Sequence, residues 1–335
     1  MAGLAVPLVF VVAGVLLVWK GSEYFERAAE RLSKHYGLPV AVHGAIVVAV
    51  GSSMPEFSSV VISTVVHGEF SLGVGAIVGS AIFNLLVIPA LSVFFSEELA
   101  ATRGLVHRDA QFYVISVLVL FVVFALGATY VPGGTNTAAM LTPPLTVLPL
   151  ATYGVYVFLH QQDASEHAAD RVAGVSPARE SVILVAALAV IGVGVEGLVR
   201  AALALGDAFG TPSFLWGLTV IAAGTSLPDA FVSVRAAQND DSVTSLTNVL
   251  GSNTFNLLVA IPVGVLLAGS ATINFLAAIP TIGFLAFATL VFIVFTRTGL
   301  ELTNAEGYGF LGLYGLFLVW MTLESVGAIE TVRGI

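Results

Sequence analysis

Cysteine is absent from this chain of 335 residues, and charged side chains make up only 10% of it. The lack of cysteine excludes disulfides and thiolate metal sites, although it does not identify a cellular compartment. The scarcity of charge, together with 57% hydrophobic residues and a mean hydropathy of +0.99, excludes an ordinary soluble domain. The net charge is −9, and we expect no nucleic-acid partner.

Long apolar runs fill most of the sequence, and they exceed the roughly 20 residues that a membrane-spanning helix needs. The sequence therefore predicts an all-α integral membrane protein with ten transmembrane helices, five in each half of the chain. The expected spans are 4–20, 40–67, 71–96, 109–128, 140–159, 181–200, 213–237, 243–269, 273–296 and 307–328.

An internal repeat relates the two halves. Shifting the first half by 173 positions aligns Glu23 with Glu196 and Glu56 with Asp229. An odd number of spans in each repeat turns the second repeat upside down in the membrane, a plan common among secondary transporters. We therefore expect two inverted-topology repeats with helices broken at mid-membrane. The expected divisions are the first repeat at 1–159, a linker at 160–180 and the second repeat at 181–335.

Basic residues are distributed unevenly between the two sets of connections. One set holds ten of them, whereas the other holds only Arg200 and Arg333. The positive-inside rule places the richer set in the cytoplasm. We expect a multi-pass protein of the cell membrane, surrounded by lipid, with both termini outside and the linker cytoplasmic. The ten residues are Lys20, Arg27, Arg31, Lys34, Arg103, Arg108, Arg171, Arg179, Arg235 and Arg297.

Two short motifs each place a carboxylate inside an apolar span. They read Gly51-Ser52-Ser53-Met54-Pro55-Glu56 and Gly224-Thr225-Ser226-Leu227-Pro228-Asp229. Glycine and proline are expected to break both helices, which leaves carbonyl groups that are tolerated at this depth only if they line a cavity or bind something. Carboxylates, hydroxyls and carbonyls together suit Ca²⁺ or Na⁺. Each serine with the acid three residues later also forms a capping box, and both roles can hold together.

A second motif occurs once in each repeat, as Gly79-Ser80-Ala81-Ile82-Phe83-Asn84 and Gly251-Ser252-Asn253-Thr254-Phe255-Asn256. In each copy the serine and the final asparagine are four residues apart, so they share one face of a helix. Asparagine carbonyls are good Ca²⁺ ligands. The alternative is that the glycine and serine allow close helix packing and that the asparagine bonds to a neighbouring helix.

These four motifs, in this order, resemble the two alpha-repeats of the cation/Ca²⁺ exchanger superfamily, and the closest branch is the Na⁺/Ca²⁺ exchangers. The resemblance implies an antiporter rather than an enzyme, working as a monomer and exchanging Na⁺ for Ca²⁺ by alternating access, with no cofactor besides the transported ions. It also implies four adjacent cation sites between the second, third, seventh and eighth spans, and sliding first and sixth spans. The implied ligands are the side chains of Glu56, Asp229, Ser53, Ser226, Ser80, Ser252, Asn84 and Asn256, with contributions from Ser52, Thr225 and the carbonyls of Ala49 and Ala222.

Three alternatives remain at this point. K⁺-dependent members of the superfamily carry an aspartate where Asn256 stands, so the resemblance favours the K⁺-independent type. A Ca²⁺/H⁺ antiporter would use the same fold with protonatable acids. An intramembrane aspartyl protease would also place two acids in the bilayer, but its Gly-x-Gly-Asp run is absent. The linker is too short for the Ca²⁺-sensing insert of large eukaryotic exchangers.

Overall fold

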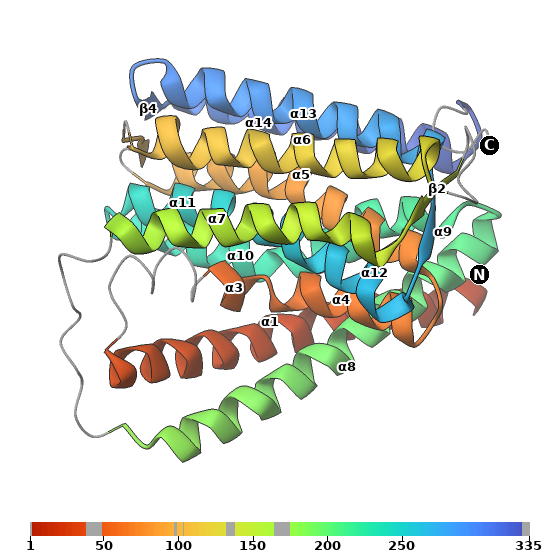
Figure 1. The fold of residues 1–335 in the computed structure, drawn as a ribbon, viewed down its shortest axis with the longest axis horizontal. Coiled ribbons are helices and arrows are strands. Elements are labelled where there is room, and N and C mark those ends of the chain that lie inside the picture. The colour runs from red at the N-terminus through yellow and green to blue at the C-terminus, as the bar shows by residue number, and fades with distance from the viewer. Residues whose placement is uncertain are drawn as a thin grey trace.

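The computed structural model describes residues 2–37, 49–96, 99–102, 104–131, 138–163 and 175–329. Most of these residues are helical, and the helices lie side by side along the long axis of the molecule (Figure 1). Among the described residues, seven helices are long and apolar enough to cross a membrane.

Helices occupy all ten expected ranges, although residues 40–48 of the second range lie outside the described residues. The first half contains α1 (Ala2–Tyr36), α3 (Ala49–Ser52), α4 (Met54–Val65), α5 (Phe70–Phe95), η2 (Leu105–Asp109), α6 (Ala110–Thr129), η3 (Pro143–Thr146) and α7 (Val147–Asp163). The second half contains α8 (Pro177–Phe209), α9 (Ser213–Trp216), η5 (Gly217–Ile221), α10 (Ala222–Gln238), α11 (Ser242–Phe255), η6 (Asn256–Ala260), α12 (Ile261–Ala268), α13 (Phe275–Arg297) and α14 (Asn304–Ser325).

Four short strands in the part of the chain that the structure describes make the all-α prediction incomplete. Strand β1 (Leu99–Ala100) pairs antiparallel with β4 (Glu301–Leu302), and β2 (Ala138–Leu141) pairs antiparallel with β3 (Ala271–Asn274). They occur where connections between helices run beside each other, because the backbone N–H and C=O groups there need partners. Each pair joins one half of the chain to the other, and β4 and β2 lie at opposite ends of the molecule (Figure 1).

Two helices are much longer than the predicted spans. Helix α1 has 35 residues where 4–20 was expected, and α8 has 33 where 181–200 was expected. At about 1.5 Å per residue, α1 is roughly 52 Å long, whereas the hydrocarbon core of a bilayer is about 30 Å thick. The basic residues from Lys20 to Lys34 therefore lie on a helical extension of α1 and not in a loop.

The two predicted helix breaks have different outcomes. The first is confirmed, since α3 ends at Ser52, Ser53 is non-helical and α4 begins at Met54. The second is wrong, because α10 continues through Pro228. Proline cannot donate a hydrogen bond to the carbonyl four residues earlier, so the carbonyl of Gly224 loses its usual helical partner although the helix continues.

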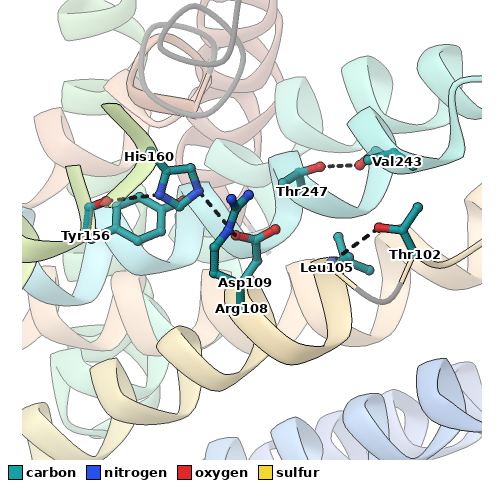
Figure 2. A network of polar contacts seen from close by, with 8 residues as sticks. All are labelled: Thr102, Leu105, Arg108, Asp109, Tyr156, His160, Val243 and Thr247. Carbon is teal, nitrogen blue, oxygen red and sulfur yellow. Dashed lines mark hydrogen bonds and ion pairs between the residues drawn. The ribbon is translucent and has the colours of Figure 1, made fainter. Parts of the chain in front are cut away.

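The linker is shorter than expected because both flanking helices extend into it. Helix α7 reaches Asp163, α8 begins at Pro177, and residues 164–174 lie outside the described residues. His160, expected at the start of the linker, is instead buried in α7. Its Nε2 lies 3.2 Å from Oδ1 of Asp109, which also accepts a hydrogen bond from Nε of Arg108 (Figure 2). This contact fixes the end of α7 against the start of α6.

Helix α5 forms the centre of the protein. It is predominantly apolar and buried along most of its length, as expected for a helix surrounded by others. Glycines allow its backbone to approach α10 closely: a Cβ added to Gly79 would meet the Cβ of Ala222 at 2.7 Å. The interpretation of the Gly79-Ser80 pair as a close-packing contact is therefore correct for Gly79. The side chain of Ser80 has a different role, which follows from its hydrogen bonds.

Candidate functional site: a buried pair of carboxylates

The two acids of the repeated motifs lie at the junction of α4, α5, α10 and α11. Glu56 is on the first turn of α4 and Asp229 is in the middle of α10. Ten of the twelve residues predicted to form the site have fully buried side chains, with 0% exposure. They are Glu56, Asp229, Ser52, Ser53, Ser80, Ser226, Ser252, Thr225, Asn84 and Asn256.

Glu56 is held by hydroxyl groups from both halves of the chain. Its Oε1 accepts hydrogen bonds from Oγ of Ser80 and Oγ of Ser226, each at 3.2 Å. These two hydroxyls are 2.6 Å apart. Ser80 therefore faces the site, as its spacing to Asn84 predicted, while the glycine before it packs against α10.

Asp229 is held mainly by the second motif. Oδ2 accepts a hydrogen bond from Nδ2 of Asn84 at 2.9 Å, and Oδ1 accepts one from Oγ of Ser252 at 3.5 Å. The hydroxyl of Ser252 also lies 3.1 Å from that of Ser52 at the end of α3. Each carboxylate is thus contacted by residues of both repeats.

Several buried oxygens around the acids have no hydrogen-bond partner among the described residues. They are Oε2 of Glu56, Oγ of Ser53 and the side-chain oxygens of Asn84 and Asn256. Buried polar atoms in native proteins nearly always have a partner, so each such atom requires an explanation. Carboxylate, hydroxyl and amide oxygens are the ligands that hard cations such as Ca²⁺ prefer.

For three predicted site residues, the described contacts are with their own helix or are few, and none of these contacts is with the two acids. The hydroxyl of Thr225 donates to the carbonyl of Ile221 at 3.1 Å, so it is used by its own helix. Ala222 is the first residue of α10, and its carbonyl lies 3.4 Å from the same hydroxyl. Ala49 is the first residue of α3. Residues 38–48, which precede it, lie outside the described residues.

The capping interpretation of both serines is wrong. Ser53 occupies the N-cap position of α4 but makes no side-chain hydrogen bond to the helix. Ser226 lies inside the continuous helix α10, so there is no helix start for it to cap. Both serines are consequently available to the buried acids.

Two further asparagines belong to this network and were not singled out from the sequence. Asn253 accepts a hydrogen bond from Nδ2 of Asn84 at 3.1 Å and donates one to the carbonyl of Ala81, its repeat equivalent. Asn248 accepts from Oγ of Ser52 at 3.4 Å. A signal existed for Asn248, because it precedes Ser252 by four residues and so shares its helix face.

The electrostatics of this site favour a bound cation. Among the described residues, neither Glu56 nor Asp229 forms an ion pair with a basic side chain. All their described partners are neutral hydroxyl and amide groups. Two buried carboxylates without a counter-charge carry a large desolvation penalty. An all-oxygen site with this charge matches the coordination that Ca²⁺ prefers.

Comparison with known proteins identifies the family. The family model for "Sodium/calcium exchanger protein" matches residues 6–160 and 180–323. The chain is 25% identical to the sodium/calcium exchanger MaX1 of Methanosarcina acetivorans over 94% of this chain and 98% of that protein. It is 40% identical to the human sodium/potassium/calcium exchanger 4 over 102 residues, which is 30% of this chain and 16% of that protein.

A solved structure supports the same fold. The sodium-calcium exchanger NCX_Mj, soaked with Na⁺ and Sr²⁺, superposes with a TM-score of 0.66 at 24% identity, covering 94% of this chain and 98% of that one. At this identity the likeness establishes the fold alone. The family match leaves out only the two ends and residues 161–179 between the two halves. The chain therefore belongs to the sodium/calcium exchanger protein family of membrane transporters.

Proposed function

We propose that this protein is an antiporter that exchanges Na⁺ for Ca²⁺ at the site formed by Glu56 and Asp229. The observation that carries the proposal is the pairing of two buried carboxylates with neutral partners and with unpartnered oxygens on Glu56, Ser53 and Asn84. One Ca²⁺ would neutralise both acids. Several Na⁺ ions would occupy the same oxygens, so the two cargoes exclude each other.

Because Ca²⁺ and Na⁺ cannot occupy the site together, the flux of one ion is coupled to the opposite flux of the other. A charge-compensated site is able to change its access from one side of the membrane to the other, whereas an empty dianionic site carries the desolvation penalty described above. The inward Na⁺ gradient would then expel Ca²⁺. The proposed ligands are the side chains of the two repeated motifs, with Ser52, Thr225 and the carbonyls of Ala49 and Ala222 contributing.

We further propose ten spans arranged as two inverted repeats in the cell membrane, with both termini outside and a cytoplasmic linker, acting as a monomer. The strand pairs support the inversion. Strands β4 and β2 each precede the last helix of their half, yet they lie at opposite ends of the molecule (Figure 1). Equivalent segments at opposite ends are what an inverted repeat requires.

Other members of the superfamily couple Ca²⁺ transport to K⁺ or to H⁺. The human relative, for example, is a sodium/potassium/calcium exchanger. The neutral Asn256 favours exchange without K⁺, because an aspartate there would add a third carboxylate to the site. A Ca²⁺/H⁺ antiporter would use Glu56 and Asp229 as proton carriers.

The deciding experiment uses purified protein in proteoliposomes loaded with Na⁺. We expect uptake of ⁴⁵Ca²⁺ when the outside Na⁺ is removed, and no dependence on K⁺ at constant ionic strength. Control vesicles loaded with choline are expected to show no uptake. Uptake driven by a proton gradient in the absence of Na⁺ would replace the proposal by Ca²⁺/H⁺ exchange, and a requirement for K⁺ would replace it by K⁺-dependent exchange.

A further inference from the structure

A cleft of about 240 Å³ lies between α1 and α10, beside the proposed exchange site. Its walls carry three acids and two bases, together with Pro228, which directly precedes Asp229 in the chain. The charged residues are Glu23, Glu26, Arg27, Glu30 and Arg235. The helical extension of α1 therefore builds a charged cleft next to the buried carboxylates, and the family motifs do not include it.

Glu26 differs from the other two acids of the cleft. Glu23 forms ion pairs with Lys20 at 2.8 Å and with Arg27 at 2.6 Å, and Glu30 pairs with Lys34 at 2.6 Å. In contrast, Oε1 of Glu26 is fully enclosed and has no hydrogen-bond partner among the described residues. Two of the three acids are thus compensated by charge, and Glu26 is the one with a buried oxygen that has no partner among the described residues.

Glu26 also lies against the helix break that leads to the exchange site. A Cβ added to Gly51 would be 3.9 Å from Cγ of Glu26. Gly51 is followed by Ser52, whose hydroxyl lies 3.1 Å from that of Ser252, the partner of Asp229, and by the buried Ser53. Glu26 therefore contacts both the cleft and the segment that carries Ser52 and Ser53.

We propose that Glu26 is an access ligand that binds Ca²⁺ in this cleft before the ion reaches the Glu56 and Asp229 site. This inference rests on the proposed function and adds to it a loading step on one side of the membrane. Under the proposed topology the cleft faces the cytoplasm, because Arg27 and Arg235 belong to the cytoplasmic set of basic residues. An uncompensated carboxylate in a narrow cleft raises the local concentration of cations and thereby the rate at which they bind.

The first test measures transport from each side separately, in everted and right-side-out vesicles. We expect Glu26→Gln to raise the KM for cytoplasmic Ca²⁺ at least threefold, while the KM for external Ca²⁺ and the maximal rate stay unchanged. Glu26→Asp is expected to restore most of the cytoplasmic affinity. The matched control is Glu30→Gln, because Glu30 lies in the same cleft but is paired with Lys34. Equal KM changes on both sides, or no change on either, would overturn the access role.

The second test detects binding without transport. Trp19 lines the same cleft, so a Tb³⁺ ion bound at Glu26 as a substitute for Ca²⁺ is expected to be sensitised by its indole ring. In a Glu56→Gln, Asp229→Asn background, which removes the central charge, we expect Tb³⁺ emission that falls at least twofold with Trp19→Phe. Unchanged emission would contradict the site even if Glu26→Gln failed to fold.

The two proposals fail in different ways. If Glu56→Gln leaves exchange intact, the proposed exchange site is wrong whatever Glu26 does. Suppose instead that Glu56→Gln stops exchange, that Glu26→Gln does not change the KM for cytoplasmic Ca²⁺ alone, and that Trp19→Phe does not reduce Tb³⁺ emission. In that case only the access site is wrong.

Discussion

Asn84 donates a hydrogen bond to Asp229 at 2.9 Å, whereas the repeat-equivalent pair, Asn256 and Glu56, is not joined by any hydrogen bond in the described structure. Both side-chain atoms of Asn256 and one oxygen of Glu56 are buried without a partner. The site is therefore asymmetric. Both oxygens of Asp229 accept hydrogen bonds, whereas Oε2 of Glu56 has no partner among the described residues.

Neutralising either acid is expected to abolish Ca²⁺ transport while the protein stays folded. Glu56→Gln and Asp229→Asn each remove one of the two charges but keep the size of the side chain. Losing one charged contact costs about 1.5–3 kcal/mol, which corresponds to a roughly 10- to 150-fold weaker affinity for Ca²⁺. The measurement is ⁴⁵Ca²⁺ uptake alongside size-exclusion chromatography. Wild-type uptake rates in both variants would refute the site.

The same substitution at the two asparagines is expected to give different results. Asn256→Asp places a third carboxylate where no hydrogen bond is lost, so the site gains room for another monovalent charge and exchange becomes K⁺-responsive or Ca²⁺ release becomes slow. Asn84→Asp removes the donor to Asp229 and sets two carboxylates against each other, so we expect loss of folded protein.

K⁺ titrations of uptake at constant Na⁺ and ionic strength, with thermal unfolding in detergent, separate these outcomes. Identical behaviour of the two aspartate variants would contradict the asymmetry. A wild-type protein that requires K⁺ would contradict the role given to Asn256.

Helix ranges and buried acids were predictable because apolar runs and repeated motifs are local features of the sequence. The length of α1 was not predicted, since the apolar run ends near Lys20 and the residues after it are rich in charge. They continue the helix instead, because Lys20–Glu23, Glu23–Arg27 and Glu30–Lys34 are ion pairs three or four residues apart, which support a helix outside the apolar core.

The ligand motifs were also predicted more accurately than the geometry around them. Pro228 was expected to break its helix as Pro55 does, but α10 continues, since buried helices tolerate a proline when neighbouring groups satisfy the freed backbone. Asn253 escaped notice because its repeat equivalent is Ala81, so the repeat gave no matching polar residue. Its role depends on a contact with Asn84 that lies 169 residues away in sequence.

Close packing of α1 against α8 is expected to depend on Gly194. A Cβ added there would lie 2.8 Å from the carbonyl oxygen of Gly14 and 2.9 Å from Cβ of Leu17. Overpacking of this kind costs about 1–3 kcal/mol, so Gly194→Ala should lower the thermal unfolding temperature. Gly192→Ala is the matched control on the same helix, since an added Cβ meets nothing within 4 Å. Equal unfolding temperatures for the two variants would show that this contact does not hold the helices together.

Ser53 is expected to contribute to ion binding without stabilising the ion-free protein. Its buried hydroxyl has no described partner, so Ser53→Ala removes an unsatisfied polar atom and should keep or raise the ion-free stability, by up to about 1–3 kcal/mol. The same change removes a proposed ligand and should reduce the stabilisation that added Ca²⁺ produces. Ser63→Ala is the matched control, because its hydroxyl is also buried and unpartnered on α4, whereas its Cβ lies 3.5 Å from a Cβ added to Gly73. Unfolding temperatures measured over a Ca²⁺ titration decide the matter: a full Ca²⁺ shift in Ser53→Ala would remove Ser53 from the ligand set.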